Sequence, residues 1–180
     1  MAQETVFEGS LQWAGPRPGQ AFSYDSFDRT TQLQFAGGAQ VQASAPAEFH
    51  GDDALCNPET LMLASLMQCH FLTFMAVASK SGATVLSYRD AGSGRLAMKD
   101  GRMRYVEVTL RPAVVLSDPA HMARLAVFHD KAHANCFMAN SVNFPVRSYV
   151  SFFPGTLKSV GPEIHHEAIL QRADLALKRA

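Results

Sequence analysis

The chain has 180 residues, of which 47% are hydrophobic, and its 16 basic residues balance its 16 acidic ones. This length suits one domain with a sizeable core, which we expect over residues 1–154 with a C-terminal extension over 155–180. A neutral chain without long runs of one sign makes nucleic acid and membrane surfaces poor partners. The N-terminal segment lacks the features of a secretory signal, so we expect a cytoplasmic protein with reduced or catalytic cysteines.

The first fifty residues are predicted to form extended structure. Polar and apolar residues alternate over 8–13, and the Pro- and Gly-rich segment 15–19 ends that run. Alternation returns over 31–35, where Gly37-Gly38 predicts a hairpin turn into a second strand over 39–42. A loop is predicted to lead from this strand to a helix.

A long apolar helix is predicted after the loop. Asn57 suits the N-cap, Pro58 the first helical position and Glu59 the positive end of the helix dipole, while Gly82 suits the stop. The stretch 60–79 has no charged residue and is long enough to span a bilayer. It also contains several polar side chains that hydrocarbon would penalise, so a central helix covered by protein is favoured.

The rest of the chain alternates between strands and helices. Asp118-Pro119 predicts the start of a second helix by the same cap-and-proline pattern. The other predicted elements are strands over 84–89, 94–99, 103–116 and 143–153, and a C-terminal helix over 161–180. This order favours an α+β fold with mainly antiparallel sheet. A central helix that is apolar all round needs more cover than one small sheet supplies, so we expect a homodimer.

Two cysteines lie on the two predicted helices. Cys69 is in the middle of the apolar helix, and Cys136 shares one face of the second helix with His129 and His133. If the fold brings the thiols together, one could attack a peroxide and the other could resolve the product. Together with His70, the same residues could instead form a metal site. Because no Cys-x-x-Cys pair is present and helical histidines are usually packed in a core, we expect no metal.

A series of short motifs surrounds these cysteines. In chain order they are Gly51-Asp52, Asn57-Pro58-Glu59, Cys69-His70, Leu110-Arg111-Pro112, Ala132-His133 through Val146, and Cys136 with Asn140-Ser141. In order and spacing they resemble the OsmC/Ohr family of organic hydroperoxide reductases, over roughly residues 5–153. The resemblance implies an OsmC-like fold, with mainly antiparallel sheets packed on a long central helix. It also implies an intertwined homodimer with two active sites at the subunit interface.

The resemblance implies a role for each site residue. Cys69 would be the peroxidatic cysteine, and Cys136 would resolve it as an intramolecular disulfide. Family members activate the peroxidatic cysteine with an arginine held by the glutamate that matches Glu59. Arg29 is the expected arginine, and Arg17 is the alternative. The implied substrate is an organic hydroperoxide, and the implied reductant is a dithiol such as a lipoylated protein, with no cofactor.

The spacing of Glu59 and Cys69 constrains this site. Ten residues of continuous helix separate them by about 15 Å along the axis. Either the helix breaks between them, or Glu59 reaches the cysteine of the partner subunit, or Glu59 is merely a first-turn carboxylate that favours the helix dipole. The alternative to a peroxidase is a non-catalytic OsmC-like protein that binds a small molecule or senses redox state.

Two further expectations concern residues around the site. Apolar lining by Phe71, Phe74, Phe137 and Phe144 would favour alkyl or aryl hydroperoxides over hydrogen peroxide, although these residues could equally belong to the core. Cys56, the remaining thiol, is expected to be a small buried apolar residue, with a role as a second resolving group as the alternative.

Overall fold

The protein is described by a computed structural model that covers residues 4–16, 18–19 and 21–154. Across these residues it has an α+β architecture with nine strands in three sheets and two α-helices. The chain divides into two compact units, residues 1–62 and residues 63–180. The long helix α1 (Pro58–Lys80) begins in the first unit and continues in the second.

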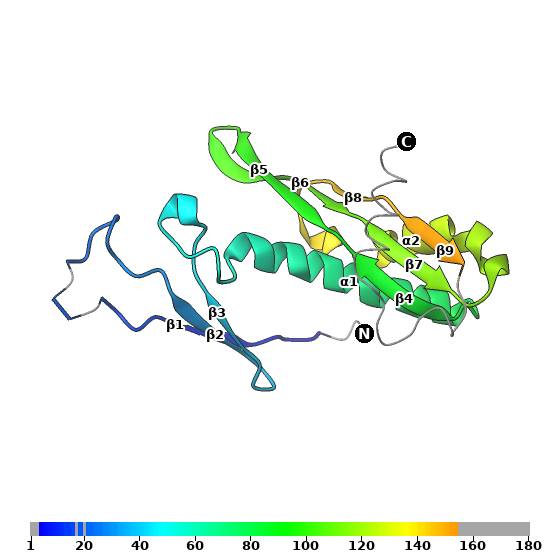
Figure 1. The fold of residues 1–180 in the computed structure, drawn as a ribbon, viewed down its shortest axis with the longest axis horizontal. Helices are drawn as coiled ribbons and strands as arrows, with labels where there is room; N and C mark the ends of the chain where they lie inside the picture. Colours follow the sequence, from blue (N-terminus) through cyan, green and yellow to red (C-terminus); the bar gives the residue numbers. More distant parts are fainter. Residues whose placement is uncertain (1–3, 17, 20, 155–180) are drawn as a thin grey trace. The chain divides into compact units, whose positions relative to one another are not determined.

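The first unit contains a small antiparallel sheet of order β1–β2–β3 (Figure 1). Its strands are Gly9–Gln12, Thr31–Phe35 and Gln40–Ala43, and a 3₁₀ turn over Ala47–Phe49 follows. Gly37 and Gly38 both have positive φ between β2 and β3, so the predicted hairpin is present and uses the conformational freedom of glycine. Among the described residues of this unit, only Ala43 and Ser44 are buried. The sheet therefore has almost no core of its own.

Helix α1 begins and ends where the sequence predicts. The Asn57 side chain accepts a hydrogen bond from the Thr60 amide at 2.8 Å, and the Thr60 hydroxyl accepts one from the Asn57 amide at 3.0 Å. These reciprocal bonds satisfy amides that the helix itself leaves unpaired. After Lys80, Gly82 has φ +75° and the Ala83 amide donates to the Ala78 carbonyl at 3.0 Å, which ends the helix in a glycine C-cap.

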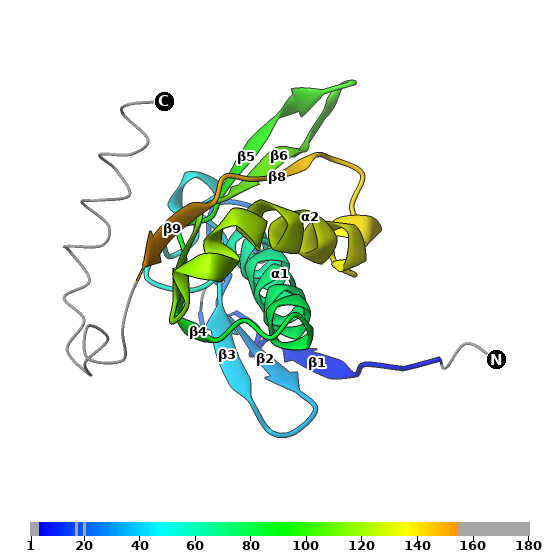
Figure 2. The same cartoon turned by 90° about the vertical axis from the view of Figure 1, so that its right-hand side faces the viewer.

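The second unit combines two three-stranded sheets with helix α2 (Leu125–Asn135), which packs across α1 (Figure 2). One sheet has the order β4–β7–β9, formed by Val85–Asp90, Pro112–Leu116 and Ser151–Pro154. The other has the order β5–β6–β8, formed by Ser93–Lys99, Arg102–Leu110 and Val146–Ser148. The pairs β4–β7 and β5–β6 are antiparallel, whereas β7–β9 and β6–β8 are parallel.

Three predicted elements are divided in the structure. The run predicted over 103–116 becomes β6 and β7, which enter different sheets on either side of Arg111. The Arg111 amide donates to the side-chain carboxylate of Asp90 at 2.7 Å instead of to a backbone carbonyl. The run predicted over 143–153 likewise divides into β8 and β9. The second helix starts as a 3₁₀ turn over Pro119–Arg124 before becoming α2, and the predicted C-terminal helix lies outside the described residues.

Two hydrophobic clusters hold the second unit together. The first joins α1, α2 and β7 through Phe74, Phe128 and Val114, among others. The second joins α1 to β6 through Leu66, Val108 and Leu110. Helix α1 thus buries one stripe of residues four apart, yet only 22% of its most apolar window is buried within the chain. By length and composition alone α1 could cross a membrane, but its packed stripe and its polar residues favour a helix covered by protein.

Replacing Phe74 with alanine tests the first cluster. Phe74 is completely buried between α1 and α2, so Phe74→Ala is expected to lower the free energy of unfolding by about 3–5 kcal/mol. Val127, which is 49% exposed on α2, provides a control whose alanine variant is expected to change stability by about 0.5 kcal/mol or less. Urea denaturation measures both, and equal losses would show that the cluster does not stabilise the fold.

Candidate functional site

The fold brings the two predicted thiols into contact. Cys69 lies in the middle of α1 and Cys136 directly follows α2. The Cys136 thiol forms a hydrogen bond with Cys69, and both cysteines are free. The Met138 amide donates to the Cys69 sulfur at 3.5 Å, and the Ala139 amide donates to the Cys136 sulfur at 3.5 Å. Two residues that are far apart in sequence therefore share one small polar site.

The turn after α2 carries Cys136 toward α1. Cys136 leaves the helix with extended backbone angles, so the predicted helical position of this residue is wrong. The Asn140 side chain donates to the Ala134 carbonyl at 3.0 Å, and the backbone N–H of Asn140 donates to the Cys136 carbonyl at 3.0 Å. The Ser141 hydroxyl donates to the Phe137 carbonyl at 2.7 Å. The Asn140-Ser141 motif therefore holds the turn that presents both the thiol and the two amides.

The two thiols differ in exposure. Cys136 is 1% exposed, whereas Cys69 is only partly buried. Burial raises the pKa of the Cys136 thiol, and the adjacent Cys69 raises it further. Cys136 is therefore protonated at neutral pH and shielded from solvent. Cys69 is therefore the more exposed of the two cysteines, and Cys136 lies beside it.

A pair of buried histidines lies between the same two helices. His70 Nε2 and His129 Nδ1 are 3.0 Å apart, and the two rings are stacked with their centroids 5.3 Å apart. Burial lowers the pKa of His70 to about 4 and that of His129 to about 3, so both are neutral at pH 7 and one donates to the other. His133, which was predicted to share one face of the second helix with His129 and Cys136, is exposed. Over the described ranges, no group of three or more His, Cys, Asp or Glu is arranged to hold a metal ion.

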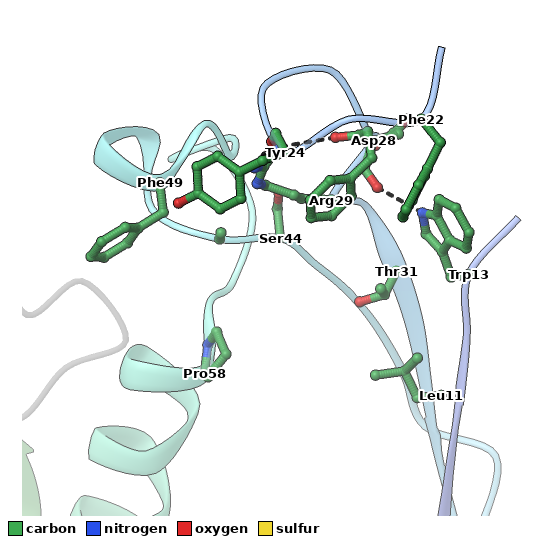
Figure 3. Close-up of a pocket in the computed structure, with 12 residues that line it drawn as sticks. Leu11, Trp13, Phe22, Tyr24, Asp28, Arg29, Thr31, Ser44, Phe49 and Pro58 are labelled. Carbon is green, nitrogen blue, oxygen red and sulfur yellow. Dashed lines mark hydrogen bonds between the residues drawn. The ribbon is translucent and has the colours of Figure 1, made fainter. Parts of the chain in front are cut away.

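Arg29 lies in a pocket of the first unit (Figure 3). Its guanidinium stands over the Phe27 ring, 4.0 Å from the centroid, and donates to the Phe27 carbonyl at 2.9 Å. It also lies 5.3 Å from the Tyr24 ring centroid. The pocket has a volume of about 570 Å³ and is lined mainly by Leu11, Trp13, Phe22, Tyr24, Phe27 and Phe49. Arg29 is therefore an ordered cation in an aromatic pocket, and Arg17 lies outside the described residues.

Glu59 lies in the first turn of α1, and its side chain is partly buried. Helix α1 is continuous from Pro58 to Lys80. The helix break that would let Glu59 serve Cys69 of its own chain is therefore absent. Two of the three predicted explanations remain: Glu59 serves the partner's cysteine, or it only favours the helix dipole.

Two other expectations are wrong. Cys56 is exposed rather than buried, and its carbonyl accepts a hydrogen bond from the Ser44 amide at 2.7 Å. The four predicted phenylalanines do not form one lining: Phe74 is in the core, Phe137 is 81% exposed, and Phe71 and Phe144 pack on Tyr88 and Tyr105. The aromatic pocket instead surrounds Arg29. The signal for it was the density of aromatic residues between positions 13 and 27.

The histidine pair predicts a pH-dependent stability. In the unfolded chain both imidazoles have a pKa near 6.5 and take up protons that the buried pair does not bind. The free energy of unfolding is therefore highest above pH 6.5 and falls as the pH drops toward 4. Each histidine contributes up to about 1.4 kcal/mol per pH unit in this window. We expect the variant His70→Phe/His129→Phe to lose much of this pH dependence in urea denaturation, and His50→Gln, at an exposed position, to keep it. An unchanged pH dependence in the double variant would contradict this account.

Comparisons with known proteins agree with this architecture. A family model described as OsmC-like protein matches residues 51–150. The chain is 24% identical to the uncharacterized protein YmaD of Bacillus subtilis (strain 168) over 110 residues, which are 59% of this chain and 73% of that protein. An OsmC-like protein of unknown function from Vibrio cholerae is 31% identical with a TM-score of 0.75, covering 82% of this chain and 99% of that one.

An organic hydroperoxide resistance protein OsmC from Legionella pneumophila has the same fold. It is 15% identical with a TM-score of 0.62, covering 84% of this chain and 98% of that one. The family model spans more than half of the chain, and the Vibrio cholerae protein is more than 30% identical over most of it. The chain therefore belongs to the family of OsmC-like proteins.

Proposed function

We propose that this protein is a thiol-dependent peroxidase that reduces organic hydroperoxides to alcohols. The contact between a partly exposed Cys69 and a buried Cys136 carries the proposal, because a two-cysteine peroxidase needs one reachable sulfur and one adjacent reserve sulfur. Membership of a family whose structural relatives include organic hydroperoxide resistance proteins supports it.

The proposed reaction has three steps. The Cys69 thiolate attacks the terminal peroxide oxygen, the O–O bond breaks, and the alkoxide leaves as an alcohol after taking a proton. Cys69 is now a sulfenic acid, and Cys136 sulfur attacks it to form a disulfide with loss of water. An external dithiol then reduces the disulfide and becomes oxidised itself. The electrons come from thiols throughout, so no cofactor is required.

The first step needs a positive charge near Cys69. A thiol with a pKa near 8.5 is only about 3% thiolate at pH 7. Across the described ranges, the polar contacts of the Cys69 sulfur are the Met138 amide and the Cys136 thiol, and neither is charged. We propose that Arg29, oriented by Glu59, supplies the charge from the partner subunit of a homodimer. The continuous helix α1 and its large uncovered surface support this arrangement.

The pocket around Arg29 supports an organic substrate. At about 570 Å³, with five aromatic rings in its lining, it is far larger than hydrogen peroxide requires. We propose that it holds the alkyl or aryl group of the hydroperoxide while Arg29 faces the reacting oxygens. The proposed reductant is a dithiol such as a lipoylated protein, and the proposed compartment is the cytoplasm, where such dithiols are kept reduced.

Cysteine variants test the reaction. With a dithiol reductant, we expect the wild type to consume cumene hydroperoxide faster than hydrogen peroxide, and Cys69→Ser to lose at least a hundredfold in rate because the attacking sulfur is gone. Without added reductant, Cys136→Ser is expected to consume one equivalent of hydroperoxide and to accumulate a sulfenic acid, which dimedone labelling followed by mass spectrometry detects.

Cys56→Ser is the matched control, because Cys56 is exposed and is not expected to enter the reaction. It should keep the wild-type rate. Peroxide consumption that does not depend on Cys69 would overturn the enzyme proposal. In that case, saturable binding of an aryl compound in the Arg29 pocket would favour the alternative, a non-catalytic protein that binds small molecules.

Arg29→Ala tests the source of the positive charge. We expect iodoacetamide to alkylate Cys69 more slowly at pH 7, because the positive charge that favours the thiolate is lost. The rate of peroxide reduction at pH 7 should then fall roughly thirtyfold with the thiolate fraction. Arg147→Ala, which removes an exposed arginine paired with Glu107, should change neither quantity. If Arg29→Ala alkylates like the wild type, another group activates the thiol.

A further inference from the structure

Two buried histidines join α1 and α2 beside the thiol site, and the proposed reaction gives them no part. His70 is 1% exposed and His129 is 3% exposed. Within the described parts of the chain, the bond between His70 Nε2 and His129 Nδ1 is the one hydrogen bond of each ring, because the other two ring nitrogens are buried without a partner. Apolar residues could fill the same space without leaving ring nitrogens unpaired, so the polar pair calls for a function.

The pair restrains how α2 lies across α1 (Figure 2). The His129 ring stacks on the rings of His70 and Phe74, with centroids 5.3 and 4.2 Å away, which opposes rotation of α2 about its axis. The bond between the two histidines opposes sliding, because a hydrogen bond weakens steeply when its atoms separate or its angle changes. The apolar residues of the same cluster, such as Leu125 and Phe128, have no such directionality. The histidine bond is therefore the contact that selects one register of the two helices.

The histidine pair lies close to both sulfurs along the chain. His70 directly follows Cys69 on α1. His129 lies on α2, which ends at Asn135, about 9 Å further along the axis and directly before Cys136. The turn after α2 is held by hydrogen bonds of its own, so a movement of α2 would carry Cys136 with it. A disulfide requires Cβ atoms about 3.5–4.5 Å apart, so a small shift of α2 would take the two thiols out of bonding geometry.

We propose that His70 and His129 are positioning residues for disulfide formation. Their bond holds α2 in the register that places Cys136 against Cys69, whereas the apolar cluster holds the two helices together without selecting that register. This role explains why a polar pair with two unpaired ring nitrogens occupies a site that apolar residues could fill. The inference rests on the proposed function, because it concerns the same disulfide, but it does not require the reaction with peroxide.

The equilibrium of the thiol pair with glutathione measures this positioning. One molecule of glutathione disulfide takes two electrons and two protons from Cys69 and Cys136, which yields the protein disulfide and two glutathione thiols. The equilibrium constant reflects how readily the two sulfurs adopt bonding geometry, so it reports the effective concentration of one thiol at the other. We use the full chain with Cys56→Ser, because the exposed Cys56 would form a mixed disulfide with glutathione. Acid quenching, alkylation of the remaining thiols and mass spectrometry give the constant.

Replacing both histidines separates position from stability. In His70→Leu/His129→Leu no imidazole is left unpaired, so we expect cooperative unfolding in urea at pH 7 with a midpoint no lower than that of the wild type. The equilibrium constant should nevertheless fall at least tenfold, which corresponds to a reduction potential of the disulfide about 30 mV higher. The control is His133→Leu, at an exposed position of α2, which should stay within about twofold of the wild type.

Two outcomes of the double variant would contradict the proposal. A folded variant with the wild-type equilibrium constant would show that apolar packing alone positions the sulfurs. A variant that does not fold would show that the histidine pair holds the fold itself rather than the register of two helices.

Two single substitutions separate the hydrogen bond from the volume of the ring. The side-chain amide of asparagine places a polar atom close to the position of a histidine Nδ1, so His129→Asn can keep the bond to His70 and His129→Leu cannot. Asparagine is smaller than leucine and leaves the larger void. We expect the equilibrium constant of His129→Asn to stay within about threefold of the wild type and that of His129→Leu to fall at least tenfold. The reverse order would mean that the ring only fills space, and the proposal would fail.

The positioning role and the peroxidase reaction can fail separately, because these measurements contain no peroxide. A chain that forms the disulfide with glutathione in a histidine-dependent way, yet reduces no hydroperoxide, contradicts only the proposed function. A wild type whose Cys69 and Cys136 form no disulfide with glutathione contradicts the positioning role, whatever its peroxidase activity.

Discussion

The packing of α2 across α1 is the interaction on which the rest of the second unit depends. Phe74 and Phe128 fill the contact, and the bond between His70 and His129 joins the helices beside Cys69. Because α2 is held in this place, the turn that follows it delivers Cys136 to Cys69 and directs two amides at the sulfurs. The thiol site is thus a product of helix packing, and it lies on two rigid elements and one tightly bonded turn.

Burial separates the roles of two chemically identical groups. Cys136 is enclosed and its pKa is raised, so it is a thiol at neutral pH. Cys69 is partly exposed, but the second unit supplies it with an amide donor rather than with a formal charge. In the proposed reaction this site favours disulfide formation, while activation of the first thiol depends on a cation from the partner subunit. This division is the basis of the proposal that a partner subunit supplies the charge.

Features that depend on neighbouring residues could be predicted from the sequence. Features that depend on contacts between residues far apart in the chain could not. Asn57 and Gly82 mark the ends of α1 because caps depend on neighbouring residues. The division of the predicted strand at Arg111 was not predicted. Polar and apolar residues alternate in the same way whether an extended segment stays in one sheet or enters two. The exposure of Cys56 and the His70–His129 bond depend on which segments the fold brings together. The aromatic pocket depends on how the segments around Arg29 fold together, which local sequence does not specify, although its aromatic residues are already dense in the sequence.

The continuity of α1 has a mechanical consequence. An α-helix of 23 residues behaves as a stiff rod, and this one carries Glu59 near one end and Cys69 near its middle. In a dimer where Glu59 serves the partner's cysteine, each rod belongs to both active sites. A shift of one helix along its axis would then move the Glu59 that orients the arginine of one site. The same shift would move the Cys69 sulfur of the other site.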